Sequence, residues 1–279
     1  MTLQRTIEKL YTTPPEKLDR DEARKIIARF KEQLNSGEVR SAERVRGTWK
    51  VNEWVKKGII LAFRLGNIGG QRTGSQFFDK DTMGLKYFSV ENGIRIVPGG
   101  TAVRDGCFIG KGVVMMPPSY VNIGAYVDEQ TMIDSHALVG SCAQIGKHVH
   151  LSAGAQIGGV LEPIGSMPVI IEDEVMVGGN TGIYEGAIVK RRAVIGAGVV
   201  LTGSTPVYDL VKKKIYRRTT KQPLMIPSGA VVIPGSRKIE QPFAKKHELS
   251  VSTPIIIKYR DEKTDAAVVL EASLRAYEK

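Results

Sequence analysis

Cysteine, aromatic side chains and long apolar runs are all scarce in this chain of 279 residues. Its two cysteines, Cys107 and Cys142, are too few for a disulfide framework and form no C-x-x-C pair, which favours a reducing compartment. No apolar run approaches the roughly 18 residues of a membrane span, and the N-terminus lacks the apolar core of a secretory signal. We therefore predict a cytoplasmic protein that does not bind a membrane.

Acidic residues are fewer than basic ones, 29 against 40, and the formal net charge is +11. The basic residues are dispersed, with short clusters at 190–192, 212–218 and 245–246 and no basic tail. Aromatic residues, 6% of the chain, do not accompany them as in nucleic-acid binding modules, so we expect no nucleic-acid partner. We interpret the clusters as solvated surface, with attraction of anionic small molecules as the alternative.

What the chain does contain is a six-residue repeat. An aliphatic residue or methionine occupies every sixth position in one long run, in a second run after an interruption, and in a short final echo. The members are Val97, Val103, Ile109, Met115, Val121, Val127, Ile133, Val139, Ile145, Leu151 and Ile157, then Ile171, Val177, Ile183, Val189, Ile195, Leu201 and Val207, then Ile226 and Val232.

A six-residue period fits no helix face, because apolar residues of an amphipathic helix recur at three and four residues. It indicates a solenoid in which each unit is a short strand and a turn, and three units make a coil of about 18 residues. Stacked coils then pair their strands in parallel around an aliphatic axis. The fold class is therefore mainly β, a parallel β-helix of roughly six coils.

The repeat is interrupted twice. Between Ile157 and Ile171 the frame slips by two residues, which predicts a loop that leaves the solenoid. Between Val207 and Ile226 lies a longer basic excursion, which we interpret as a hairpin.

The two ends of the chain follow other patterns. Helical spacing predicts helices over 21–34 and 52–65, the second with Asn52 as its N-cap, and a short strand over 41–51. Near the C-terminus we expect a strand over 254–259 and a helix over 264–277. The predicted division is an α-helical N-terminal domain (1–94), the β-helix (95–236), and a small mixed C-terminal tail of strand and helix (237–279).

Two runs within the repeat are far more specific than a generic hexapeptide. Residues 118–128 read PSYVNIGAYVD, and residues 139–146 read VGSCAQIG. With weaker matches at 54–57, 77–80 and 93–98, they closely resemble the tetrahydrodipicolinate N-succinyltransferase family of hexapeptide-repeat acyltransferases. The resemblance covers most of the chain except parts of the two ends.

This resemblance implies a left-handed β-helix and a homotrimer with active sites between subunits; the handedness does not follow from the repeat itself. It also implies transfer of a succinyl group from the co-substrate succinyl-CoA to the amine of a ring-opened dicarboxylate acceptor in lysine (diaminopimelate) biosynthesis. CoA is expected in a groove between neighbouring solenoids. The sequence does not identify the residues that contact CoA, and both the cluster 190–192 and the basic excursion stand as alternatives for its phosphates.

Acylation of an amine by a thioester needs a group that takes the amine proton, and a dicarboxylate acceptor calls for an arginine. Asp134 directly follows the inward Ile133, so alternation places it on the outer surface. The resemblance implies that Asp134 binds the acceptor and acts as the catalytic acid/base, and that Arg95 binds a substrate carboxylate. The alternatives are a turn aspartate that bonds its own backbone and a surface arginine on an edge strand.

The family has a second carboxylate in an Arg-Ser-Glu stretch, where this chain has Asn180-Thr181-Gly182. Glu185, three residues further on, is a candidate catalytic substitute; an exposed glutamate without a catalytic role fits the sequence equally well. His136 and His148 are two repeat units apart and should lie on different faces, and the close three-histidine pattern of zinc-binding solenoids is missing. We therefore expect no metal, and a histidine base is a less favoured alternative to Asp134.

The predicted function is a CoA-dependent N-succinyltransferase. The alternatives are an N-acetyltransferase that acts on the same acceptor or on an amino sugar, and a β-helix scaffold without catalytic activity.

Overall fold

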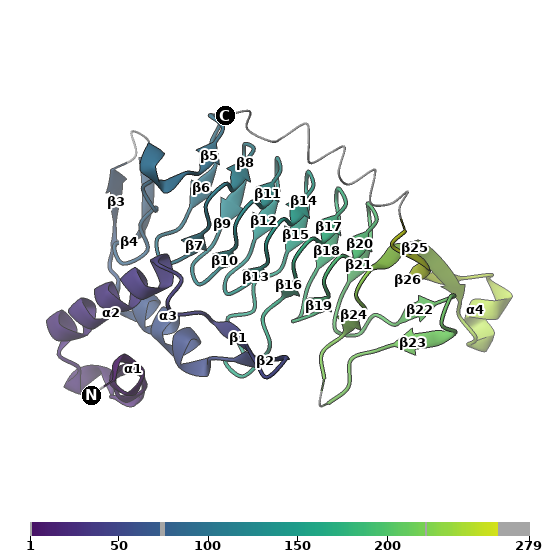
Figure 1. Ribbon diagram of the computed structural model, residues 1–279. Coiled ribbons are helices and arrows are strands. Elements are labelled where there is room, and N and C mark those ends of the chain that lie inside the picture. Colours follow the sequence, from purple (N-terminus) through teal and green to yellow (C-terminus); the bar gives the residue numbers. More distant parts are fainter. Residues whose placement is uncertain (1, 73–75, 221, 262–279) are drawn as a thin grey trace.

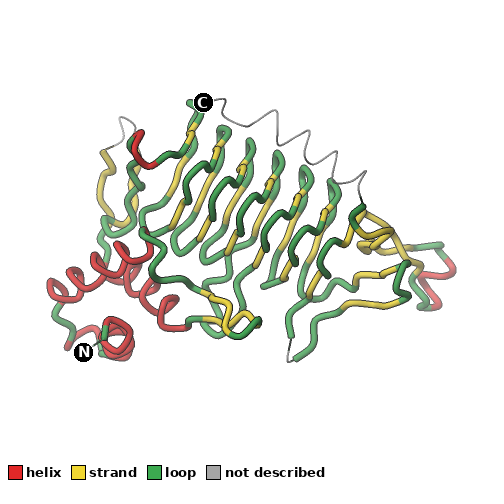
Figure 2. Tube along the Cα trace, in the orientation of Figure 1, coloured by secondary structure: helices red, strands yellow, loops and turns green. Residues whose placement is uncertain are grey.

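The computed structural model describes residues 2–72, 76–220 and 222–261. A solenoid of stacked coils forms the middle of the molecule, with a helical part at its N-terminal end and a long β-hairpin at the other end (Figure 1). Figure 2 shows that the helices flank the stacked strands. None of the helices within the described ranges is long and apolar enough to cross a bilayer.

Three parallel sheets form the solenoid, and we name them face A, face B and face C. Face A contains β5 (Arg95–Ile96), β8 (Val114–Met115), β11 (Met132–Ile133), β14 (His150–Leu151), β17 (Met176–Val177) and β20 (Val194–Ile195). Face B contains β6 (Ala102–Val103), β9 (Tyr120–Val121), β12 (Leu138–Val139), β15 (Gln156–Ile157), β18 (Gly182–Ile183) and β21 (Val200–Leu201). Face C contains β7 (Phe108–Ile109), β10 (Tyr126–Val127), β13 (Gln144–Ile145), β16 (Ile170–Ile171), β19 (Ile188–Val189) and β24 (Met225–Ile226).

The six-residue prediction is confirmed, because the predicted residues from Val103 to Val232 all belong to one buried core cluster. Each strand contributes two residues, of which the second points inward. A second inward position lies two residues earlier and carries small side chains such as Ala125, Ala137 and Val149. Small and larger aliphatic residues thus alternate along the inner side of each coil, as close packing of a narrow axis requires.

The prediction was wrong at its first member, Val97. Strand β5 ends at Ile96, which pairs with Met115 and packs against the core, whereas Val97 is only partly buried and lies outside the core cluster. The turn that follows holds Gly99 and Gly100 at φ values of 141° and 96°. Positive φ at two consecutive glycines lets this turn take one residue more than the repeat allows.

Both interruptions leave the solenoid at the same corner, between face B and face C. The first is the predicted loop, which occupies residues 158–169 between β15 and β16. The second contains the predicted hairpin, in which β22 (Val207–Asp209) pairs antiparallel with β23 (Lys214–Tyr216) before the chain reaches β24. The corner between them, after β18, is a plain turn.

The helical part contains α1 (Leu3–Thr12), a short 3-10 helix η1 (Pro15–Lys17), α2 (Arg20–Asn35) and α3 (Glu53–Leu65). The two predicted helices are confirmed, and α1 was missed. The predicted strand over 41–51 is instead a hairpin of β1 (Ala42–Val45) and β2 (Thr48–Val51), because Arg46 and Gly47 turn the chain at φ values of 49° and 81°. The Asn52 side chain donates to the Arg40 carbonyl and does not cap α3.

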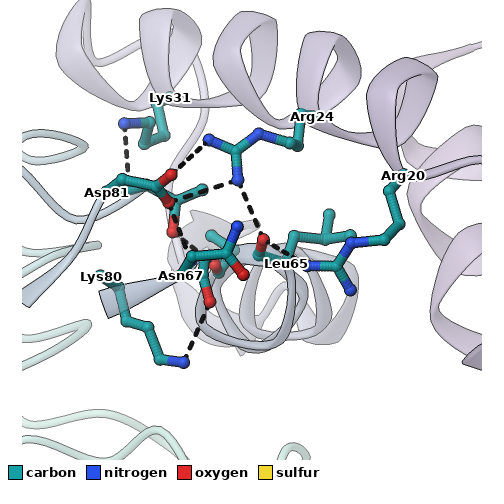
Figure 3. Close-up of polar contacts among 10 residues, drawn as sticks. Arg20, Arg24, Lys31, Leu65, Asn67, Lys80 and Asp81 are labelled. Carbon is teal, nitrogen blue, oxygen red and sulfur yellow. Dashed lines mark hydrogen bonds and ion pairs between the residues drawn. The ribbon is translucent and has the colours of Figure 1, made fainter. Parts of the chain in front are cut away.

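Arginines of α2 hold the C-terminal end of α3 (Figure 3). Arg20 and Arg24 donate to the Leu65 carbonyl at 2.9 and 3.0 Å, and Arg24 also forms a two-bond ion pair with Asp81. Cationic donors satisfy carbonyls that the helix itself leaves unpaired. Asp81 follows the hairpin of β3 (Ile68–Arg72) and β4 (Gln76–Lys80), so the same cluster ties this hairpin to the helices. The 3-10 helix η2 (Val90–Asn92) then leads into β5.

At the other end, β25 (Ala230–Lys238) continues face A and pairs antiparallel with β26 (Ser250–Tyr259) through α4 (Pro242–Lys246). The predicted strand over 254–259 is therefore confirmed as part of a longer strand. The predicted helix over 264–277 lies outside the described residues.

Candidate active site

Asp134 lies at the corner between face A and face B, directly after β11. Its side chain is partly exposed, and its Oδ1 accepts the Ser135 backbone N–H at 2.7 Å. Asn122 and Asp128 make the same bond to the next residue at 2.8 and 2.9 Å. The turn role considered for Asp134 is therefore present, but it uses one oxygen and leaves Oδ2 without a hydrogen bond to a described residue.

Arg95 lies on β5, at the N-terminal end of face A, with an exposed side chain. Its strand neighbours in register are Val114 and then Met132, two residues before Asp134. Strands of a sheet are about 4.8 Å apart, so Arg95 lies roughly 10 Å from Met132 along the solenoid axis. Arg95 and Asp134 therefore border the same face of one chain.

Glu185 lies elsewhere, in the plain turn after β18 at the corner between faces B and C. It is exposed, it has a φ of 53°, and its Oε2 accepts the Gly203 backbone N–H at 2.7 Å. Within one chain, the structure does not bring Glu185 to Asp134, because the two residues follow strands of different faces.

A cavity of about 630 Å³ opens beside Glu185. The loop 158–169 forms one wall, the turn that begins at Tyr184 forms the floor, and the other wall consists of Arg218, Thr219, Thr220, Gln222 and Pro223. Sequence reasoning singled out Glu185 and both excursions, the second of which contains Arg218, but missed Tyr184. The repeat count contains a signal for this site: both excursions and the turn with Glu185 follow strands of face B, so they must leave the solenoid at one corner.

Comparisons with known proteins show the family to which this chain belongs. Residues 2–65 match the family model for the N-terminal part of tetrahydrodipicolinate N-succinyltransferase, and residues 168–203 match a hexapeptide repeat of succinyl-transferases. The 2,3,4,5-tetrahydropyridine-2,6-dicarboxylate N-succinyltransferase of Idiomarina loihiensis is 43% identical over 93% of this chain and 92% of its own length. The enzymes of the same name from Afipia carboxidovorans and Dechloromonas aromatica are 42% and 39% identical over 91% and 98% of this chain, and over 90% and 98% of their own lengths. This chain belongs to the tetrahydrodipicolinate N-succinyltransferase family.

The resemblance noted in the sequence is thereby confirmed for the family. In this tetrahydrodipicolinate N-succinyltransferase family member, the two thiols are poor candidates for chemistry. Burial raises the pKa of Cys107 to about 12 and that of Cys142 to about 11, and both side chains are fully buried. A thiol that stays protonated and inaccessible does not act as a nucleophile.

His136 and His148 lie on different sides of the solenoid, as the repeat predicted: His136 is at the corner between faces A and B, and His148 is at the corner between faces C and A. Among the residues that the structure describes, no three His, Cys, Asp or Glu side chains gather closely enough to hold a metal ion. The basic cluster 190–192 lies at the corner between faces C and A, where Arg191 pairs with Glu174.

Lys56 fixes the loop that walls the cavity. It lies on α3, fully buried, and its Nζ donates to the Ser166 carbonyl at 2.5 Å. Ser166 itself lines the cavity. This bond ties the loop that interrupts the solenoid to the helical part.

The buried Lys56 amine predicts a pH dependence of stability. Burial lowers its pKa, so between the folded and the unfolded pKa values the unfolded state binds more protons. Stability must then rise with pH toward the unfolded value of about 10.4. We expect urea denaturation to show wild type gaining stability relative to Lys56→Met between pH 7 and 10. Lys57→Met, at a partly exposed neighbour, serves as control; a Lys56→Met difference that stays flat or reverses would contradict the burial argument.

Proposed function

We propose that this chain is an N-succinyltransferase that moves the succinyl group of succinyl-CoA to the amine of ring-opened tetrahydrodipicolinate, a step of lysine and diaminopimelate biosynthesis. The observation that carries the proposal is about 40% identity to enzymes of that name over almost the whole chain. The placement of Asp134 and Arg95 along one face adds support, because the acceptor carries an amine and carboxylates.

In the proposed reaction, Asp134 accepts the proton of the amine as it attacks the thioester carbonyl. The C–N bond forms, the C–S bond breaks, and CoA leaves as the thiol after taking up a proton. Arg95 binds a carboxylate of the acceptor through its guanidinium fork. Oδ1 of Asp134 is held by Ser135, which leaves Oδ2 to meet the amine. No metal is part of this proposal.

Glu185 is proposed as a second carboxylate, contributed by a neighbouring chain. Asp134 and Glu185 lie at different corners of one solenoid, so a site that uses both needs two subunits. A homotrimer with active sites between subunits, built on left-handed β-helices, is therefore part of the proposal. The division at 1–94, 95–236 and 237–279 is kept as a proposal, with the second boundary inside β25. A cytoplasmic location is proposed for the same biosynthetic role.

Acyl-donor kinetics test the proposed function. We expect kcat/KM for succinyl-CoA to exceed that for acetyl-CoA at least tenfold with the same acceptor. The succinyl group carries a free carboxylate, and a site that binds this carboxylate discriminates against an acyl group that lacks it. Release of the CoA thiol measures both rates. Turnover with acetyl-CoA alone would favour the acetyltransferase alternative, and no turnover with either donor would favour a scaffold.

A further inference from the structure

Tyr184 occupies the floor of the cavity between the two excursions. The turn that it begins is the one plain turn at this corner between the loop 158–169 and the excursion before β24. Residues of both excursions therefore line the cavity together with Tyr184. The cavity volume of about 630 Å³ is that of an ordinary ligand site.

Two glycines make room for the tyrosine ring. A Cβ added to Gly182 would lie 2.5 Å from Cε2 of Tyr184 and 2.9 Å from its hydroxyl oxygen, so the ring folds back over its own strand. A Cβ added to Gly158, one coil earlier, would lie 2.8 Å from Cδ1 of the same ring. The other strands of face B carry a side chain at the position of Gly182, for example Gln156 and Val200 in register on either side.

The ring is thus held against face B with its hydroxyl over Gly182, and Tyr184 also lines the cavity. The charged side chains among the described lining residues are Glu162, Glu185 and Arg218. Carboxylates only accept hydrogen bonds, and Glu185 already accepts the Gly203 N–H. An anion that enters the cavity therefore needs hydrogen-bond donors from other residues. A phenol hydroxyl is a neutral donor and can meet an anion without adding a charge.

We propose that the Tyr184 hydroxyl donates a hydrogen bond to a carboxylate of a bound substrate, and that Gly182 and Gly158 hold the ring for this purpose. The inference rests on the proposed function, in which both the succinyl donor and the dicarboxylate acceptor carry such a group. Tyr184 is then a substrate-binding residue of the reaction.

Tyr184→Phe tests the hydroxyl alone. We expect kcat/KM to fall roughly 10- to 100-fold, the usual loss for a hydrogen bond to a charged group. A rise in KM for succinyl-CoA assigns the carboxylate to the donor, and a rise in KM for the acceptor assigns it to the acceptor. Tyr11→Phe, which removes a hydroxyl from α1, is the matched control and should keep wild-type kinetics.

Gly182→Ala tests the placement of the ring. The added methyl must displace the ring, so we expect a loss of activity similar to that of Tyr184→Phe, with unchanged thermal stability and little further loss in the double variant. Gly69→Ala, where the added Cβ meets nothing within 4 Å, is the control. Wild-type kinetics in Tyr184→Phe, or additive losses in the double variant, would overturn the inference while the proposed function stands. An inactive wild type would remove the proposed function and this inference with it.

Discussion

Asp134→Asn is expected to lower kcat about 10²- to 10⁴-fold, the range found when a general base is removed. Asparagine keeps an oxygen that can accept the Ser135 N–H, a bond of 2.7 Å in the structure, so the turn is preserved. What disappears is the ability to take up the amine proton. Steady-state release of the CoA thiol at saturating concentrations of both substrates measures the loss.

Asp128→Asn is the matched control for this experiment. Asp128 follows the inward Val127 as Asp134 follows Ile133, and it bonds the next N–H at 2.9 Å. It lies at a different corner, between faces C and A. If Asp128→Asn and Asp134→Asn lose activity equally, or neither does, both aspartates are turn residues and the proton acceptor lies elsewhere.

The core of the solenoid could be predicted because its constraint is one-dimensional. Each inward residue, such as Ile145 or Ile183, meets the same environment as its neighbours one coil away, so the same side-chain type recurs at a fixed spacing. The prediction was wrong at Val97, where the coil is not yet stacked on both sides and the turn glycines change its length. Periodicity constrains only the residues that have neighbours on both sides.

The candidate site could be predicted less well from the sequence, because it depends on the corner of the solenoid at which each excursion leaves. Glu185 and the basic excursion each stood out in the sequence. Their proximity follows from the number of repeat units between them, since both follow strands of face B. Tyr184 could not be recognised as a site residue at all, because its position depends on the absence of side chains at Gly182 and Gly158. The sequence showed that Gly182 stands where the family has a glutamate, but it did not show that the Tyr184 ring covers this position.

The largest expected effect on stability is that of Leu151→Ala. Leu151 is fully buried on β14, between Ile133 and Val177 in register, so the truncation leaves a cavity in the axis. Coils contact only their neighbours, and distant parts of the chain cannot fill the space. We expect a loss of about 2–5 kcal/mol in the free energy of unfolding. Urea denaturation at a fixed protein concentration measures this difference.

Leu210→Ala makes the same chemical change at a side chain that is 62% exposed in the hairpin excursion, and it should change stability by no more than about 0.5 kcal/mol. The comparison also connects the core to the site, because the Leu151 carbonyl accepts the Asp134 backbone N–H at 2.9 Å. Movement of β14 into the cavity would shift this carbonyl, so Leu151→Ala should also reduce kcat in the folded protein. Equal stability losses in the two leucine variants would mean that the aliphatic axis does not hold the solenoid together.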